Sequence, residues 1–217
     1  MAAPRIEQLS PMLLEQSARP FDDEAYAFEP KHDGFRALIQ VDEGDVEIRS
    51  RQGVSMTKWF PEIGMVLPEL GGGRHVIDGE IIVPGMDGFA GDAEFKRLVK
   101  RAARRGYRAG DDLVAFVAFD LLVHSDRSVM ALPWHRRRTR LHNLFTKLQS
   151  EEAKRIAWVT GHVEAAGTML YRSVLARELE GIVAKRLASP YRPGERAIDW
   201  LKIKRPGAVP RGRFREA

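Results

Sequence analysis

The stretch Phe28-Glu29-Pro30-Lys31-His32-Asp33-Gly34-Phe35-Arg36 sets a lysine between a probable strand and a glycine turn. After it, residues 36–42 (RALIQVD) and residues 45–50 (DVEIRS) alternate apolar and polar side chains, and Glu43-Gly44 between them is a turn signal. Alternation with a period of two predicts strands, and a short turn joins antiparallel neighbours, so the two segments are predicted to form a β-hairpin. Lys31 is expected at the end of the strand that leads into this hairpin.

The rest of the chain mixes strands and helices without the regular alternation that a wound parallel sheet requires. Apolar, β-branched or aromatic stretches predict buried strands over 75–83, 113–122, 181–186 and 199–204. Apolar spacing and start signals predict helices over 58–70, 92–105, 133–148 and 163–178, with a loop at 189–194. We therefore expect an α+β fold with antiparallel sheets, in which residues 1–206 form one domain and residues 207–217 a flexible basic tail.

Composition narrows the class of protein. The chain has 217 residues, of which 44% are hydrophobic and 30% charged, as in an ordinary globular protein with a proper core. Cysteine is absent, which excludes disulfides, thiolate zinc sites and a cysteine nucleophile. The sequence has neither an apolar run long enough to span a bilayer nor a secretory leader pattern, so we expect a cytoplasmic protein with no membrane partner.

Basic residues are concentrated in three places. The formal net charge is +5, and the clusters lie at 96–108, at 135–140 and from Lys202 onward. A surplus of positive charge fits a polyanionic partner such as nucleic acid. The first two clusters are either contacts to a DNA backbone or solvated helix faces, and the sequence leaves both interpretations open.

The common nucleotide fingerprints GxxxxGK[ST] and GxGxxG are absent from the sequence. Lys31 is chemically unusual because it lies close to an acid, an arginine and a glycine turn. A lysine is a nucleophile only when its amine is neutral. Since its free pKa is about 10.4, neutrality near pH 7.5 costs about 4 kcal/mol. Burial and neighbouring cations lower that pKa, so a catalytic Lys31 would need a buried pocket with cationic walls.

Five further short motifs follow Lys31-His32-Asp33-Gly34 along the chain. In order they are Ser50-Arg51-Gln52-Gly53, Asp78-Gly79-Glu80, Phe116–Asp120 (FVAFD), Glu180–Lys185 (EGIVAK) and Trp200–Lys204 (WLKIK). The set resembles the covalent nucleotidyltransferase superfamily of DNA ligases, RNA ligases and mRNA capping enzymes. It is most similar to bacterial ATP-dependent DNA ligases linked to end-joining repair, over residues 11–206 or so.

The resemblance implies a fold, a reaction and a substrate. The fold is the adenylation (nucleotidyltransferase) domain, with two antiparallel sheets and flanking helices around an ATP cleft, similar to ATP-grasp enzymes. By the resemblance, Lys31 attacks the α-phosphate of ATP, releases pyrophosphate and becomes lysyl-AMP. AMP would then pass to the 5′-phosphate of nicked double-stranded DNA, and a 3′-hydroxyl would displace it to seal the strand.

The motifs also imply roles for individual side chains on the phosphate side of the cleft. Lys185, Lys202 and Lys204 match lysines that contact phosphates, which need charge stabilisation throughout the transfer. Arg51 matches a position that contacts the phosphate region of AMP or the nick. Arg36 matches an arginine near the ribose and the DNA phosphates.

Other matches concern the metal and the base. Glu80 and Glu180 match carboxylates that bind the divalent cation or the ribose, and carboxylate oxygens suit Mg²⁺ or Mn²⁺. Phe119 matches an aromatic residue that stacks on adenine. Glu29 matches a side chain near the adenine amino group. His32 stands at the variable position of its motif, and the resemblance implies no role for it.

The sequence departs from the family after the last motif, where only about a dozen residues follow. That is too few for the OB-fold domain with which full ligases continue. We therefore expect slow lysyl-AMP formation and weak nick sealing unless a repair-protein partner or a separate OB-fold domain takes part.

Three other functions compete with the DNA ligase interpretation. Within the superfamily they are an RNA ligase and a capping enzyme that uses GTP. Outside it, a non-catalytic nucleic-acid-binding module of a repair assembly is possible on charge alone. The presence of Lys31, Glu80 and Glu180 argues against such a module, because a decayed site should have lost some of them.

Overall fold

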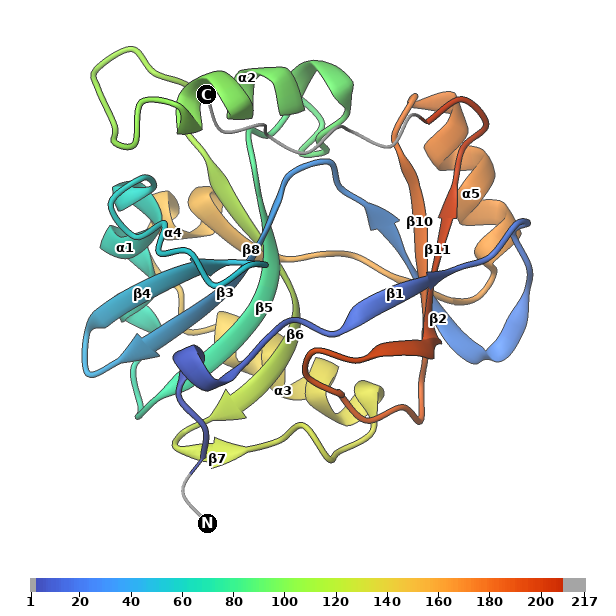
Figure 1. Ribbon diagram of the computed structural model, residues 1–217, viewed down its shortest axis with the longest axis horizontal. Coiled ribbons are helices and arrows are strands. Elements are labelled where there is room, and N and C mark those ends of the chain that lie inside the picture. Colours follow the sequence, from blue (N-terminus) through green and yellow to red (C-terminus); the bar gives the residue numbers. More distant parts are fainter. Residues whose placement is uncertain (1–2, 209–217) are drawn as a thin grey trace.

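Two β-sheets lie side by side, one built mainly from the two ends of the chain and one from its middle (Figure 1). The structure is a computed structural model that describes residues 3–208, so residues 209–217 of the expected tail lie outside the described residues. Sheet A has the order β1 (Leu13–Gln16), β11 (Arg196–Lys204), β10 (Gly181–Arg186), β2 (Asp23–Lys31) and β9 (Val163–Ala165). Sheet B has the order β4 (Asp45–Ser50), β3 (Phe35–Asp42), β5 (His75–Ile82), β6 (Ala115–His124) and β7 (Arg127–Ser128), and β8 (Ala157–Val159) pairs with β6.

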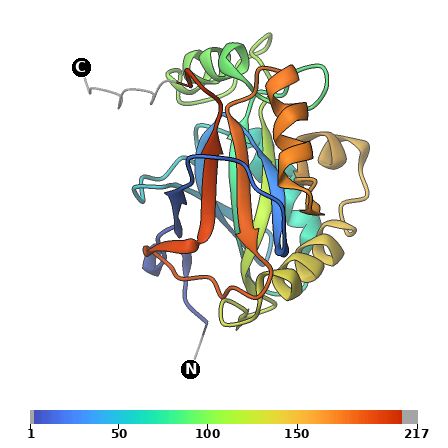
Figure 2. The same ribbon diagram turned by 90° about the vertical axis from the view of Figure 1, so that its right-hand side faces the viewer.

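Helices cover the outer faces of both sheets. They are α1 (Pro61–Val66), α2 (Asp92–Ala102), α3 (Trp134–Phe145), α4 (Glu151–Ile156) and α5 (Gly167–Ala176), with short 3-10 helices at Ile6–Gln8 and Leu67–Leu70. Helix α5 contacts β2 and β10 of sheet A, and Figure 2 shows it lying along those strands. Helices α3 and α4 contact β6 and β8 of sheet B, and α2 contacts β5 at one end of the molecule (Figure 1). No helix within residues 3–208 is long and apolar enough to cross a membrane.

The expected α+β class, with two sheets and flanking helices, is confirmed. The hairpin is β3–β4, which pairs antiparallel from Ala37–Ser50 to Asp42–Asp45. Both sheets are antiparallel apart from two pairs, β1 with β11 and β6 with β8, which are parallel. We did not predict β1 or β8, because strands of four and three residues are too short to show a period of two.

The expected helix over 163–178 is wrong at its start. Residues 163–165 form β9, which pairs antiparallel with β2, and α5 begins only at Gly167. The pairing partner lies more than a hundred residues earlier in the chain, so local apolar spacing could not reveal it. Helix α5 then begins where Gly167 packs closely against β2, since a Cβ there would meet the ring of Phe28 at 2.4 Å.

Other boundaries shift for local reasons. The expected helix over 58–70 divides into α1 and the 3-10 helix at Leu67–Leu70, and a proline stands at the first or second position of each. The expected strand over 199–204 extends back to Arg196, because β1 pairs along it. Helix α4 was not predicted, and its first turn is capped by Ser150, whose side chain accepts a hydrogen bond from the amide of Ala153.

Side chains along the strands of sheet A alternate between a face that packs into the apolar core and a face that points to the pocket. On β2 the side chain of Phe28 packs with Ile182 of β10 and Ile203 of β11 in the core beneath α5. The side chains between these positions point to the opposite face of sheet A, toward sheet B. The candidate functional residues described next occupy these alternate positions.

Candidate active site

Three neighbouring strands of sheet A place residues of the sequence motifs opposite one another. The rows across β2, β10 and β11 are Lys31–Gly181–Lys204, Glu29–Val183–Lys202 and Ala27–Lys185–Trp200. Because every second residue faces the same way, all three rows point to one face of the sheet. The expectation that Lys202 and Lys204 share a face is therefore consistent with the pairing.

A pocket opens between this face and sheet B. Six of the predicted site residues line it: Glu29, Lys31, Arg36, Glu80, Phe119 and Lys185. Arg36 and Glu80 come from β3 and β5, where they are paired partners, and Phe119 comes from β6. The space between these side chains is about 450 Å³ when its mouth open to solvent is included.

Lys31 lies at the last position of β2 in a cluster of opposite charges. Its Nζ is 2.7 Å from Oε2 of Glu180, and Oε1 of Glu180 is 2.6 Å from Nζ of Lys204. The Lys31 side chain is 20% exposed, so its amine can be reached from the pocket. One carboxylate thus holds two lysines at the same end of the site.

The immediate surroundings of Lys31 correct the expected charge pattern. Burial lowers the pKa of the Lys31 amine, but the carboxylates of Glu180 and Glu80 outweigh burial and raise that pKa above its ordinary value. The walls nearest the amine are therefore acidic rather than cationic, and Lys31 is protonated in the protein alone. A neutral amine requires added positive charge at these carboxylates.

Glu80 faces Lys31 from sheet B. Burial raises the pKa of Glu80 to about 7, against the opposing effects of Lys31 and Arg36. Among the residues that the structure describes, its carboxylate forms neither an ion pair nor a hydrogen bond. Close approach to the Lys31 motif is possible because Gly34 has no side chain: a Cβ there would lie 2.8 Å from Cγ of Glu80.

Gly181 lies between Lys31 and Lys204 in their row. Its φ is +152°, and the backbone of β11 packs directly against its Cα. A Cβ at this position would meet the backbone oxygen of Ile203 at 2.1 Å. We expect Gly181→Ala to push β10 and β11 apart, to lower the free energy of unfolding by about 1–3 kcal/mol, and to slow reaction at Lys31.

Chemical denaturation and covalent labelling with ATP measure the two effects of Gly181→Ala. Gly64→Ala is the matched control, because no atom lies within 4 Å of a Cβ in helix α1 at that position. That substitution should leave stability unchanged or raise it by up to about 1 kcal/mol. Equal stability and labelling in the two variants would contradict the packing argument.

The inner end of the pocket holds a second charged cluster. Nζ of Lys185 lies 2.7 Å from Oε2 of Glu29, 4.3 Å from the Phe119 ring centre and 4.3 Å from that of Trp200. Burial lowers the pKa of Lys185, while Glu29 opposes the shift. Nη1 of Arg138 lies 3.1 Å from Oε1 of Glu29, yet that oxygen is without a hydrogen bond among residues 3–208.

Lys185 lies at the other end of the pocket-facing strands from Lys31. Its register partner on β2 is Ala27, four residues and so roughly 13 Å along the strand from Lys31. The Lys185 side chain is 2% exposed and is already paired with Glu29. This position and this pairing weigh against the expected phosphate contact of Lys185, which stays a prediction.

Arg36 is held by a buried network that joins the two sheets. Its Nε and Nη2 each donate to one carboxylate oxygen of Asp78 at 2.6 Å, and its guanidinium lies 4.5 Å from the Phe119 ring centre. Tyr191, in the loop before β11, donates its hydroxyl to Asp78 at 2.6 Å and accepts the amide of Met12 at 2.9 Å. Arg36 is thereby fixed over the pocket without free rotation.

Four predicted residues lie outside the pocket lining: Glu180 and Lys204, which are paired beside Lys31, and Arg51 and Lys202. Arg51 is exposed on the turn that follows β4, so its position suits contact with a large partner better than contact with ATP in the pocket. Lys202 lies on the pocket-facing side of β11 and is half-buried. Burial, together with the neighbouring charges of Lys204 and Arg196, lowers the pKa of Lys202.

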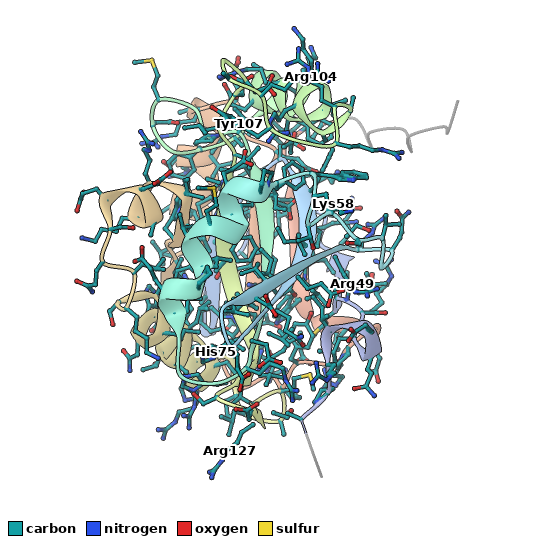
Figure 3. The ribbon with its side chains drawn as sticks, turned by 90° about the vertical axis from the view of Figure 1, so that its left-hand side faces the viewer. Arg49, Lys58, His75, Arg104, Tyr107 and Arg127 are labelled. Carbon is teal, nitrogen blue, oxygen red and sulfur yellow. The ribbon has the colours of Figure 1, made fainter. Side chains whose placement is uncertain are left out.

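The basic clusters seen in the sequence are partly structural. Arg101 of α2 is buried and donates to both carboxylate oxygens of Glu62 at 2.9 and 3.1 Å. Arg137 and Arg138 of α3 are also buried, and Arg137 is paired with the buried Asp120. These three arginines are therefore unavailable to DNA. Other members are exposed, such as Arg104, which Figure 3 labels at the edge of the molecule and which is paired with Asp111.

Sequence reasoning missed two side chains that complete the pocket wall. His32 and Thr160 both line it, and Nε2 of His32 lies 3.4 Å from Oγ1 of Thr160. Thr160 follows β8, a strand too short to be recognised, so the sequence carried no signal for it. The His32 ring was visible as part of a motif, but nothing in the spacing indicated where it points.

Comparison with known proteins agrees with this geometry. The model of the ATP dependent DNA ligase domain family matches residues 9–204. DNA ligase C1 of Mycolicibacterium smegmatis is 32% identical over 203 residues, which cover 90% of this chain and 56% of that protein. The multifunctional non-homologous end joining protein LigD of the same species is 30% identical over 201 residues, which cover 92% of this chain and 24% of that protein.

A solved structure points the same way. Mycobacterial DNA ligase D complexed with ATP and MES superposes with a TM-score of 0.77 at 28% identity, over 93% of this chain and 62% of that chain. The present chain spans about half the length of DNA ligase C1. Because the family model covers almost all of residues 3–208, the chain belongs to the family of ATP-dependent DNA ligase domains.

Proposed function

We propose that this chain performs the nucleotidyl transfer of an ATP-dependent DNA ligase, with Lys31 as the nucleophile. The Nζ lone pair attacks the α-phosphorus of ATP, a P–N bond forms, and the bond to pyrophosphate breaks as pyrophosphate leaves. AMP then passes from Lys31 to the 5′-phosphate of a nick, and the 3′-hydroxyl of the nick displaces AMP. The observation that carries the proposal is the half-buried Lys31 side chain, which lines one pocket with Glu80 and Phe119. Its amine is paired with Glu180, which also holds Lys204.

The two ends of the pocket support different parts of the substrate. Phe119 offers an aromatic face for the base, and Oε1 of Glu29, which is ion-paired with Arg138 but forms no hydrogen bond among residues 3–208, offers an acceptor at the inner end. Lys204 and Lys202 offer positive charge along β11 near Lys31, where the triphosphate would lie. Arg36 is held between these ends by Asp78 and suits the ribose or its neighbouring phosphate.

A divalent cation, Mg²⁺ or Mn²⁺, fits the carboxylates of Glu80 and Glu180. No group of three or more potential metal ligands occurs within residues 3–208. Proteins nevertheless often bind Mg²⁺ through only one or two carboxylates, and water and substrate phosphates supply the remaining ligands. When bound, the cation supplies positive charge to the triphosphate. Glu80 and Glu180 would then be neutralised, which removes the interactions that raise the pKa of Lys31.

Binding of the cation should depend on pH through Glu80. Because burial raises the pKa of this carboxyl to about 7, it carries a proton below that pH, and the proton must leave before the carboxylate can bind a metal ion. We expect the apparent affinity for Mn²⁺, measured by electron paramagnetic resonance with a non-hydrolysable ATP analogue, to fall about tenfold per pH unit below pH 7. Above pH 7 it should level off.

Glu80→Gln is the control for the pH experiment, since it keeps the shape of the side chain and removes the titrating group. Protonation of the nucleotide itself affects both proteins alike, so it cancels in the comparison. We expect the variant to bind Mn²⁺ more weakly and to lose the additional pH dependence. A wild-type profile that runs parallel to the variant profile from pH 5.5 to 8.5 would remove Glu80 from the metal site.

Transfer of AMP to nucleic acid tests the proposed substrate. Protein labelled with AMP is separated from ATP and mixed with nicked duplex DNA, nicked duplex RNA or 5′-diphosphate RNA. We expect loss of the label from the protein only with nicked DNA, and AMP on its 5′-phosphate. Transfer to nicked RNA would favour an RNA ligase, and covalent labelling by GTP instead of ATP would favour a capping enzyme.

Nick sealing is measured separately from transfer, because the chain spans about half the length of DNA ligase C1. Sealing by the chain alone and with an added OB-fold domain shows whether a partner is required. A protein that binds nicked DNA but forms no adduct under any of these conditions would instead fit a non-catalytic repair module. The cytoplasmic, nucleoid-associated location stays a prediction.

A further inference from the structure

His32 has an unusual environment that the proposed transfer step does not use. Its ring lines the pocket beside Lys31, and its Nδ1 is buried without a hydrogen-bond partner among residues 3–208. Burial and the positive charge of Lys31 lower the pKa of His32 to about 4, so the ring is neutral at physiological pH. A buried ring nitrogen without a partner, in a side chain that lines a pocket, is costly unless a ligand completes its hydrogen bonding.

The ring is fixed in orientation by a stack of three groups. Phe89, in the loop after β5, lies parallel to His32 with ring centres 5.7 Å apart. The guanidinium of Arg177 also lies over the Phe89 ring, 5.0 Å from its centre. The amide of the adjacent Asp33 donates to the carbonyl of Ala90 at 3.1 Å, which ties the same loop to the Lys31 motif. Both nitrogens of His32 therefore keep set directions.

Thr160 decides which nitrogen carries the proton. Its hydroxyl donates to the carbonyl of Gly161 at 3.5 Å, so Oγ1 is left as an acceptor for Nε2 of His32 at 3.4 Å. We assign the proton to Nε2 on this basis, which leaves Nδ1 as an acceptor. Nδ1 of His32 thus carries a lone pair and no hydrogen, so it can only accept a hydrogen bond.

A second acceptor belongs to the same pocket wall. Oε1 of Glu29 forms no hydrogen bond among residues 3–208, although Nη1 of Arg138 lies 3.1 Å from it as an ion-pair partner, and Arg138 also donates to the carbonyl of Thr160. Thr160 therefore links the environment of Glu29 to that of His32. Two acceptors in the wall of a nucleotide pocket suit an exocyclic amino group and oppose a carbonyl oxygen.

We propose that His32 is a specificity-determining residue, whose Nδ1 accepts a hydrogen bond from the 6-amino group of the bound purine together with Glu29. This inference rests on the proposed function, because it concerns the nucleotide that Lys31 attacks. It predicts discrimination against purines with oxygen or hydrogen at position 6. Guanine and hypoxanthine would place an acceptor against two acceptors, and an unsubstituted purine would leave both unsatisfied.

Equilibrium binding separates base recognition from chemistry. The probes are the α,β-methylene triphosphates of adenosine, inosine and purine riboside, which cannot react at the α-phosphorus, and titration calorimetry gives their dissociation constants. We expect wild-type protein to prefer the adenosine analogue to the other two. In His32→Phe, which keeps an aromatic ring against Phe89, that preference should shrink about three- to tenfold, as expected for one lost hydrogen bond.

Two further variants distinguish the hydrogen bond from the shape of the wall. Thr160→Ser keeps the hydroxyl and should keep the preference, whereas Thr160→Val removes the acceptor for Nε2 and should weaken it. His162→Phe is the matched control, because His162 packs on Trp134 and is not part of the pocket lining. It should behave as wild type.

An unchanged preference in His32→Phe, in a protein that still binds the adenosine analogue, overturns the role of His32 and leaves the proposed function standing. A preference lost equally in Thr160→Ser and Thr160→Val also overturns it, since shape would then be the cause. Absence of binding by all three analogues to wild-type protein overturns this inference and the proposed function together.

Discussion

Lys31→Arg is expected to abolish the covalent protein–AMP adduct, with a loss of more than about 10³-fold in the rate of its formation. Arginine keeps the positive charge beside Glu180, so the ion pair that links β2 to β10 and Lys204 can persist. Its guanidinium is not deprotonated in proteins and cannot attack phosphorus. The variant should fold and bind ATP but gain no mass when incubated with ATP and Mg²⁺.

Intact-protein mass spectrometry measures this directly, and circular dichroism confirms the fold of the variant. Lys154→Arg is the control, because Lys154 is exposed on α4, paired only with the neighbouring Glu151 among the described ion pairs. It should accept AMP as wild type does. An adduct of normal size on Lys31→Arg would show that another residue carries AMP.

Asp78→Ala is expected to cause a large loss of stability, about 3–5 kcal/mol in the free energy of unfolding. Asp78 is fully buried and accepts both guanidinium bonds of Arg36 and the hydroxyl of Tyr191. Removing it leaves a largely buried positive charge without its partner, and it breaks the link between sheet B and the segment before β11. The melting temperature should fall by roughly 6–20 °C.

Guanidinium denaturation and calorimetry give the two quantities. Asp112→Ala removes an exposed ion pair with Arg97 and should cost less than about 1 kcal/mol, which controls for the loss of an Asp–Arg pair as such. Tyr191→Phe removes one of the three hydrogen bonds to Asp78 and should cost about 1 kcal/mol. If Asp78→Ala were no less stable than Asp112→Ala, the buried network would not hold the sheets.

The sequence was sufficient to predict those parts of the site that are contiguous motifs on alternating strands. The hairpin after Lys31, the strand with Glu80 and the strand from Gly181 to Arg186 follow from local patterns, and the family resemblance orders them. Alternation also indicates that Glu29 and Lys31, or Lys202 and Lys204, point the same way. These features depend on neighbours within a few residues, which a single sequence displays.

What could not be predicted depends on pairing between distant segments. The strand β9 pairs with β2, and β8 pairs with β6, so Thr160 reaches the pocket through contacts that local periodicity does not encode. Arg138 looked like one of a run of surface cations, yet it is buried beside Glu29.

The charge around Lys31 differed from expectation for the same reason. The nearest charges come from Glu80 of β5 and from Glu180, which directly precedes β10, and their sign sets the direction in which the pKa of the amine shifts. The sequence predicted cationic neighbours for Lys31, because the family resemblance places several other lysines in the same site. The structure shows that one of them, Lys204, is paired with Glu180, while Lys185 is paired with Glu29.

The account depends most on one bond, between Nζ of Lys31 and the α-phosphorus of ATP. The most direct test is to incubate the wild-type chain with ATP and Mg²⁺, digest it at neutral pH and locate AMP by tandem mass spectrometry. We expect a single AMP on the peptide that contains Lys31, with fragment ions that place it on the lysine side chain. AMP on any other residue, or none in a protein that binds ATP and Mg²⁺, would contradict the assignment of Lys31 as the nucleophile.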